Sequence, residues 1–407
     1  MAAQHGPPKE CPDVDSLMRM ASESTGLSDF GDPARRKPLE TYVTALRQDS
    51  WRGMNDRSRL EAVEYIVYHL STRLKLIADR KQYPKIAEER IERPIIIIGP
   101  PRSGSTLLHT LLAQDQDNRA PEHWLCFEPS PPPALGPPTE ERLDRTHKRM
   151  MAMFDLVPDV FVTHPYMIEE GSGALAECGS DILNIVFTCQ ELWVFYGAES
   201  YRQYLLEADH TTAMRFHHDF LQHAQWGVQS KRWALKGSDY LLWLGEAAAQ
   251  YPDAMFVWTH RDLAQQLGSL ASVQSTLRGL TGYPVTSEDR KSIARRAIDH
   301  QHDSFRKGMR SRDLLGEGRF LDVSYHDVMA DPVRAVERIY DHFGLTVSGV
   351  HAESIRNWVH NNSQTKHGAH RHSPEEFGME ASAINRQFSK YIDRFGFGFG
   401  IRPEQGD

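Results

Sequence analysis

The sequence predicts an α/β protein in which a central parallel sheet is flanked by helices, with an N-terminal helical extension and further helical insertions. A short β-branched run, "IIII" at residues 95–98, is typical of a strand that is buried on both faces. After residue 230, short apolar runs alternate with helical patterns, as parallel strands and their crossover helices do. With 40% hydrophobic and 25% charged residues, the chain of 407 residues has an ordinary globular composition.

The first part of the chain, residues 1–92, is expected to form the helical extension. Apolar residues recur at helical spacing between residues 60 and 76, which predicts a helix that packs against the main domain, residues 93–407. Residues 128–138, "EPSPPPALGPP", contain too many prolines for a helix interior or a central strand, so we expect a rigid surface segment. Residues 139–230 are mostly helical in pattern and predict an insertion.

The strands and helices of the main domain follow one another along the chain. The run at 95–98 leads through a glycine loop into a helical pattern, "STLLHTLLAQD". The stretch "RWALKGSDYLLWLGEAAAQ" predicts a strand, a loop and a helix, and "MFVWTHRD" predicts a strand that ends before the helix "LAQQLGSLASVQSTL". Another strand is expected in "GRFLDVSYHDV", after which Asp331 and Pro332 suit the N-cap and first turn of a helix.

Charge and cysteine content limit the classes of partner. A net charge of −8 provides no general field for nucleic acid or a membrane surface, so an anionic ligand needs a local positive site. Four cysteines without a C-x-x-C pair favour a reducing cytoplasm over a disulfide scaffold. The N-terminal residues lack the apolar core of a secretory signal, and no apolar run approaches the roughly 20 residues of a membrane span. We expect a cytoplasmic protein without a transmembrane segment or a nucleic-acid partner, and homo-oligomerisation stays open.

The loop after the first strand, "GPPRSGST" at residues 99–106, matches the phosphate-loop pattern G-x-x-x-x-G-K-[ST] except at the lysine, where Ser105 stands. Backbone N–H groups of such a loop, together with the N-terminus of the following helix, form a nest for an anion. Arg102 adds a planar guanidinium that binds a tetrahedral oxyanion through two donors. The pattern therefore predicts a P-loop-like sheet whose ligand is an oxyanion other than ATP with magnesium.

A P-loop kinase or NTPase is the first alternative. Its second strand should end in a carboxylate that helps to hold magnesium, but the strand "MFVWTH" ends in His260 and continues with Arg261, and Asp322 is a weak substitute. The tetrad "HRDL" at 260–263 matches the beginning of a kinase catalytic loop, yet Leu267 occupies the place of its asparagine. These departures count against a nucleoside triphosphate as the ligand.

Three segments occur in order along the chain: "PRSGST" at 101–106, "THRDLAQQLGS" at 259–269, and "SYHDVMADP" at 324–332. Together they resemble the PAPS-dependent sulfotransferase family, in particular its bacterial branch, which is related to the tyrosylprotein sulfotransferases. PAPS is 3′-phosphoadenosine 5′-phosphosulfate. The resemblance covers about residues 20–400 and implies that the first segment binds the 5′-phosphosulfate, the second the 3′-phosphate, and the third the adenosine.

The resemblance implies that PAPS is the sulfate donor and PAP the product, and that no metal takes part. Near the C-terminus, a basic segment with a serine often returns to the cofactor in this family, although His372 stands here in place of the usual tyrosine. The implied cofactor-binding residues are Pro101, Arg102, Ser103, Gly104, Ser105, Thr106, Arg261, Ser269, Tyr325, Arg371 and Ser373.

The implied reaction is an in-line transfer of the sulfuryl group to a hydroxyl of a small-molecule or lipid-like acceptor, whose site the insertion at 139–230 would shape. Lys236 precedes Arg261 at nearly the spacing of the catalytic lysine in the tyrosylprotein branch, and together with Arg102 it is expected to stabilise the developing charge.

The general base is expected in "NRAPEHWLCF", where the tyrosylprotein branch has a glutamate. Many bacterial relatives carry a glutamate directly after the tryptophan, but this chain has Leu125 there. Because an imidazole is a competent base near neutral pH, His123 is the expected base. Glu122 is the second choice, or the carboxylate that orients His123, although adjacent side chains on an extended segment point to opposite faces. A nucleotide-binding protein without catalysis, which would lack a base, is the second alternative.

Overall fold

The computed structural model describes residues 7–160, 170–228, 230–362 and 373–401, except for the side chains of residues 153–154. The chain divides into two compact units, each of which is built from separate segments. Unit 1 contains residues 1–91, 121–229 and 276–284, and unit 2 contains residues 92–120, 230–275 and 285–407. Because the units group segments by contact, the division into residues 1–92 and 93–407 stays a prediction.

Unit 2 contains a five-stranded sheet in the order β2-β3-β1-β4-β5, in which each adjacent pair of strands is parallel. The central strand β1 pairs on one side with β3 and on the other with β4, so that Ile95 lies between Ala234 and Met255. All four isoleucines of β1 are buried, as the sequence predicts for a strand covered on both faces. The strands are β1 (Ile95–Ile98), β2 (Asn118–Arg119), β3 (Arg232–Lys236), β4 (Met255–His260) and β5 (Phe320–Ser324).

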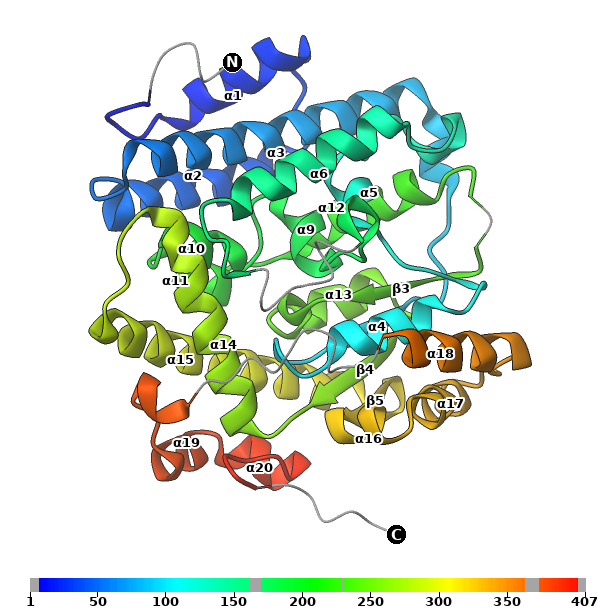
Figure 1. Ribbon diagram of the computed structural model, residues 1–407. Helices are drawn as coiled ribbons and strands as arrows, with labels where there is room; N and C mark the ends of the chain where they lie inside the picture. The colour runs from blue at the N-terminus through cyan, green and yellow to red at the C-terminus, as the bar shows by residue number, and fades with distance from the viewer. Residues whose placement is uncertain (1–6, 161–169, 229, 363–372, 402–407) are drawn as a thin grey trace. The chain divides into compact units, whose positions relative to one another are not determined.

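One face of this sheet is covered by α4 (Ser105–Ala113), α16 (Tyr325–Ala330), α17 (Pro332–His342) and α18 (Gly349–Asn361), which Figure 1 shows gathered beside β4 and β5. Because side chains alternate between the faces of a strand, Ile95, Ile97 and Val257 point into the core beneath these helices.

The opposite face carries Trp258, whose ring contacts Phe305 of α15 (Ser287–Leu315) and Phe395 of α20 (Ser389–Phe395). Side chains of β4 and β5 that point the same way as Trp258 therefore meet α15 and α20. The other helices of this unit are α13 (Leu244–Gln250), α14 (Leu263–Leu277, whose last two residues are grouped with unit 1) and α19 (Ala381–Gln387).

Unit 1 consists mainly of helices and connecting loops, and its described residues contain no β-strand. Its longest helix begins after the N-cap Asn55, whose side chain accepts a hydrogen bond from the Ser58 N–H at 2.8 Å. The predicted helix between residues 60 and 76 is confirmed as part of it. The helices are α1 (Val14–Thr25), α2 (Arg36–Ala45), α3 (Asp56–Gln82), α5 (His123–Phe127), α6 (Glu140–Phe154), α9 (Cys178–Asn184), α10 (Glu191–Tyr196), α11 (Tyr201–Glu207) and α12 (Thr211–Gln225).

The α/β fold with a parallel sheet is confirmed, and so are the predicted strands. Asp331 caps α17 by accepting a hydrogen bond from the Arg334 N–H at 3.0 Å, as its position before Pro332 predicts. The edge strand β2 was not predicted, because two residues are too short to show a period in the sequence. Within the described ranges, every helix is either too short or too polar to cross a lipid bilayer.

Candidate functional site

The loop between β1 and α4 has the backbone of an anion nest. Arg102 (φ 68°) and Gly104 (φ 84°) both adopt the left-handed conformation, in which consecutive N–H groups turn toward the same side. For Arg102 this conformation is strained, and such strain gathers at functional sites. A Cβ on Gly104 would lie 2.5 Å from the ring of Tyr325, so only glycine fits between loop and ring.

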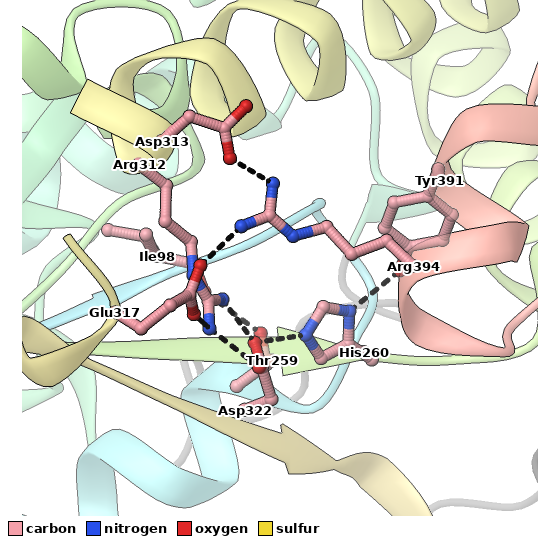
Figure 2. Close-up of polar contacts among 9 residues, drawn as sticks. All are labelled: Ile98, Thr259, His260, Arg312, Asp313, Glu317, Asp322, Tyr391 and Arg394. Carbon is pink, nitrogen blue, oxygen red and sulfur yellow. Dashed lines mark hydrogen bonds and ion pairs between the residues drawn. The ribbon is translucent and has the colours of Figure 1, made fainter. Parts of the chain in front are cut away.

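A buried serine fixes this loop to the neighbouring strand. The Ser103 hydroxyl donates to the Pro100 carbonyl oxygen at 2.7 Å, and it lies 2.6 Å from the Thr259 hydroxyl of β4. Thr259 in turn donates to the Ile98 carbonyl oxygen at 3.2 Å (Figure 2). The Ser103 hydroxyl therefore shapes the loop from within. Thr259 was not singled out in the sequence, since its role depends on β1 and β4 being neighbours.

The first turn of α4 brings a helix N-terminus and a buried cation together. Gly104 precedes α4 and has no side chain to cap it, so the N–H groups of the first turn are left for another acceptor. Lys236, the last residue of β3, is only 3% exposed, and its ammonium donates to the Thr106 hydroxyl at 3.3 Å. Ser105 is the first residue of the same turn. Positive charge from the lysine and the helix dipole thus converges on one place.

Arg102 and Arg261 connect the loop to the ends of β4 and β5. Arg102 Nε donates to the Ser269 hydroxyl of α14 at 3.0 Å, and Arg261 Nη1 donates to the Arg102 carbonyl oxygen at 3.0 Å. The Arg261 guanidinium also lies 4.3 Å from the centre of the Tyr325 ring, a cation–π distance. The residues predicted for the 5′ and 3′ ends of the cofactor are therefore brought into direct contact within unit 2.

One further contact to this loop was not predicted. Gln266, which is buried on α14, donates to the Pro101 carbonyl oxygen at 2.9 Å. Its position one helical turn before Ser269 is a signal that could have been read, because residues three apart share a helix face.

Asp322 on β5 is bound by cationic and imidazole donors. His260 Nε2 lies 2.9 Å from one of its carboxylate oxygens, and Arg312 donates to both oxygens at 2.7 and 2.9 Å. Burial alone would raise the pKa of Asp322, but the hydrogen bonds from His260 and Arg312 outweigh it and lower that pKa well below its usual range. This carboxylate forms an ion-pair network, which is not the role of a magnesium ligand in an NTPase.

The two candidates for the base, Glu122 and His123, belong to unit 1. Glu122 is extended and pairs with Leu175 in a single β-bridge, whereas His123 begins α5, so the segment is only partly extended. Glu122 accepts a hydrogen bond from the Trp124 indole N–H. His123 is 4% exposed, and its Nδ1 lies 3.6 Å from a carboxylate oxygen of Asp181 on α9. The carboxylate beside His123 is thus Asp181, a residue that was not singled out in the sequence.

The carboxylates of Asp181 and Glu122 act on the thiol of Cys126 in α5. Burial, reinforced by the charges of Asp181 and Glu122 and by the neighbouring Cys178, raises the pKa of the Cys126 thiol well above its ordinary value. The Cys126 thiol therefore stays protonated near neutral pH.

The predicted C-terminal contacts are only partly within the described residues. Ser373 lies just before the 3-10 turn Pro374–Phe377 and donates to the carboxylate of Glu375. Arg371 lies outside the described residues. In unit 1, Trp193, Phe195, Tyr196 and Tyr201 are buried, so these side chains are part of the core.

The residues gathered in unit 2 fit the two anionic ends of PAPS. Arg102, Arg261, Lys236 and the hydroxyl of Ser269 are donors that bind oxyanions, and Tyr325 offers a ring face against which a purine can lie. The Tyr325 ring packs directly against Gly104, where the Cβ of any other residue would collide with it. Among the residues that the structure describes, no group of three or more histidine, cysteine, aspartate or glutamate side chains is arranged to hold a metal ion.

Comparison with known proteins identifies the family of this chain. The family model described as "Sulfotransferase family" matches residues 94–349, which is more than half of the chain. A curated relative from Mycobacterium bovis, omega-hydroxy-beta-dihydromenaquinone-9 sulfotransferase Stf3, is 24% identical over 77% of this chain and 78% of its own.

Two crystal structures are similar over nearly the whole chain. Sulfotransferase STF9 from Mycobacterium avium has a TM-score of 0.79 at 25% identity, covering 95% of this chain and 97% of its own. Sulfotransferase STF1 from Mycobacterium tuberculosis has a TM-score of 0.76 at 26% identity, covering 94% and 100%. With its P-loop-like α/β fold, this chain is an enzyme that belongs to the sulfotransferase family.

Proposed function

We propose that this sulfotransferase takes its sulfuryl group from PAPS and transfers it to a hydroxyl of a small-molecule or lipid-like acceptor. The observation that carries the proposal is the joining of the two predicted anion sites, in which Arg102 bonds to Ser269 and Arg261 bonds back to the loop. A single phosphate would need one such site, whereas a nucleotide with phosphate groups at both its 5′ and 3′ ends needs two. PAPS supplies the activated sulfuryl group and leaves as PAP.

In this proposal the loop from Pro101 to Thr106 and the N-terminus of α4 hold the 5′-phosphosulfate. Their N–H groups, together with Arg102, are the donors. Arg261 and Ser269 hold the 3′-phosphate, and the Tyr325 ring orients the adenosine. Arg371 and Ser373 are proposed as further contacts, on the strength of the resemblance alone.

Lys236 is proposed to stabilise the charge that develops during transfer. Its ammonium is buried and bonded to Thr106 in the first turn of α4, so its field adds to that of the helix N-terminus. Burial also strengthens this field, because water does not screen it.

For the base we propose His123, with Asp181 as the carboxylate that orients its ring and stabilises the imidazolium. The 3.6 Å between Nδ1 and Asp181 is an ion-pair distance and too long for a hydrogen bond, so the effect of Asp181 is chiefly electrostatic. In this proposal Nε2 of His123 receives the acceptor's proton. Glu122, whose carboxylate is held by Trp124, is the alternative base.

The lipid-like character of the acceptor is supported by the relative Stf3, whose name states that it acts on a dihydromenaquinone carrying a hydroxyl. Insertion residues 139–230 are proposed to shape the acceptor site, as the helical pattern suggests. A cytoplasmic location is proposed as well, and four buried cysteines that form no disulfide are consistent with a reducing compartment.

The test of the proposed function combines binding and turnover. PAP without metal should raise the melting temperature of the protein, whereas ATP with magnesium should not, and PAPS with an acceptor panel should yield a sulfated product. Replacement of Lys236 by alanine should lower kcat about 100-fold or more, because one preorganised charge that stabilises the transition state is lost.

The matched control is Lys231→Ala, a lysine just before β3 that is exposed and paired with Asp117 at 2.8 Å. Turnover should be unchanged in it, because exposed ion pairs contribute little. A melting shift that requires ATP and magnesium, or equal turnover in the Lys236→Ala and Lys231→Ala variants, would contradict the proposal.

A further inference from the structure

His260, the residue before Arg261, has a polar contact at each of its two ring nitrogens. His260 is the last residue of β4 and is 1% exposed. Its Nδ1 lies 2.8 Å from the hydroxyl of Tyr391 on α20, and its Nε2 lies 2.9 Å from Asp322 on β5 (Figure 2). Two polar contacts thus fix a buried imidazole next to a residue of the proposed 3′-phosphate site.

The partners determine the tautomer of this imidazole. An ionised carboxylate can only accept hydrogen bonds, so the proton must be on Nε2, which donates to Asp322. Nδ1 of the neutral ring is then an acceptor, and the Tyr391 hydroxyl donates to it. The pKa values agree with this assignment, because burial lowers the pKa of His260 and raises that of Tyr391, which keeps the ring neutral and the phenol protonated.

Helix α20 is itself anchored, so Tyr391 is a firm partner. Its ring stacks parallel to Phe305 of α15 with centroids 3.9 Å apart. Arg394, one turn further along α20, donates to Asp313 at 2.8 Å and also bonds Glu317, to which Arg312 is bound (Figure 2). The chain of contacts therefore runs from α15, through α20, to the end of β4.

We propose that the hydrogen-bonded series Tyr391–His260–Asp322 is a positioning device for Arg261, and that it tunes how strongly the enzyme holds the 3′-phosphate of its nucleotide. The proposal rests on the proposed function, since it assumes that Arg261 meets that phosphate. The physical link is short: Arg261 is the next residue along the backbone, and its guanidinium has to reach both the Arg102 carbonyl oxygen and the Tyr325 ring. A displacement of His260 at the strand end therefore displaces Arg261.

The discriminating measurement compares two nucleotides that differ only in the 3′-phosphate. PAP carries phosphate at both ends of the nucleoside, whereas adenosine 5′-monophosphate carries the 5′-phosphate alone. Calorimetric affinities of the Tyr391→Phe variant should show about a tenfold loss for PAP and no loss for adenosine 5′-monophosphate. The phenyl ring keeps the stacking on Phe305 but leaves Nδ1 of His260 without its donor, an omission that is costly in a buried place.

A control separates positioning from general stability. Tyr340 is another buried tyrosine of unit 2; its hydroxyl donates to Asp115 at 2.6 Å and accepts from Asn118 at 2.9 Å. The Tyr340→Phe variant should lose stability while its ratio of PAP to monophosphate affinity stays at the wild-type value. If the Tyr391→Phe variant has a lower melting temperature but the wild-type ratio of PAP to monophosphate affinity, the role of Tyr391 is only structural and the inference is overturned.

A second variant decides the matter should Tyr391→Phe fail to fold. Asp322→Asn keeps the shape of a side chain that is 38% exposed, yet it weakens the bond that holds Nε2 of His260. The ratio of PAP affinity to monophosphate affinity should fall in this variant as well, and an unchanged ratio would also overturn the inference. Failure of the proposed function would give a different result, because the wild-type enzyme itself would then bind PAP no more tightly than adenosine 5′-monophosphate.

Discussion

At the scale of single residues, a buried lysine and a buried histidine carry the two proposed catalytic roles. Lys236 lies in the protein interior, where water screens the interaction between an ammonium and an approaching anion only weakly. His123 lies beside Asp181, with 3.6 Å between Nδ1 and a carboxylate oxygen. The proposed roles require both groups to be in place before a substrate binds, which is the condition under which such groups accelerate transfer most.

The competition between His123 and Glu122 can be resolved by paired variants. His123→Gln should lower kcat by about 100-fold or more, since the general base is removed, while Glu122→Gln should change kcat by only a few-fold. The measurement is the steady-state rate of sulfation at saturating PAPS. The opposite ranking would assign the base to Glu122, and Asp181→Asn should then have no effect on the rate.

Contacts between distant segments explain which residues escaped prediction from the sequence. Spacing and the family resemblance were enough to single out Arg102, Arg261 and Ser269, which the structure joins. Asp181 and Tyr391 each act through a partner far away in the sequence, and neither lies in a recognisable motif. Only the folded chain shows such pairs.

At the scale of elements, the strand–loop–helix segment formed by β1, the loop and α4 was predictable, because the sequence of each part favours one conformation. A β-branched run, two glycines and an amphipathic repeat each favour one conformation, and together they agree. Short elements lack such a signal. Strand β2 has two residues and α5 has five, so the conformation of each depends on pairing and packing with other segments of its own unit.

The glycine of the loop offers a prediction at this scale. Gly104→Ala should weaken PAP binding by at least about tenfold, because a Cβ would lie 2.5 Å from the Tyr325 ring at a residue whose φ of 84° disfavours side chains. Calorimetry with PAP measures the effect. The control is Gly349→Ala at the start of α18, where a Cβ meets nothing within 4 Å and the φ angle is not positive. Equal PAP affinity in the two variants would contradict this role for Gly104.

At the scale of the whole molecule, acidity is expected to weaken unit 1 through its buried histidines. Burial lowers the pKa of His69 to about 3, that of His217 to about 3 and that of His223 to about 4. In the unfolded chain each has a pKa of about 6.5, so below that pH the unfolded chain binds protons that the folded unit does not. Stability is therefore complete above about pH 6.5 and is lost as the pH falls toward 4.

The expected size of this effect is about 4 kcal/mol between pH 7 and pH 5.5 for the three histidines together, so urea unfolding should report a clear fall over that range. His69→Phe should reduce the pH dependence of the unfolding free energy by about a third, because one of the three histidines is removed. The variant should still fold, since the neighbours Tyr65, Tyr68 and Phe187 are aromatic and can pack against a phenyl ring. Wild-type and variant chains with the same dependence on pH would show that His69 is protonated as readily folded as unfolded.

The order of strands in the sheet has a consequence for the synthesis of this protein. Strand β1, with its four isoleucines, pairs only with β3 and β4, which begin at Arg232 and Met255. At a translation rate of about 10 residues per second, the newly made isoleucine strand waits on the order of ten seconds for a partner. During that time an apolar, β-branched segment is exposed on the nascent chain, and such segments aggregate readily. A strand that is fully buried in the finished enzyme is thus expected to be exposed while the polypeptide is still on the ribosome.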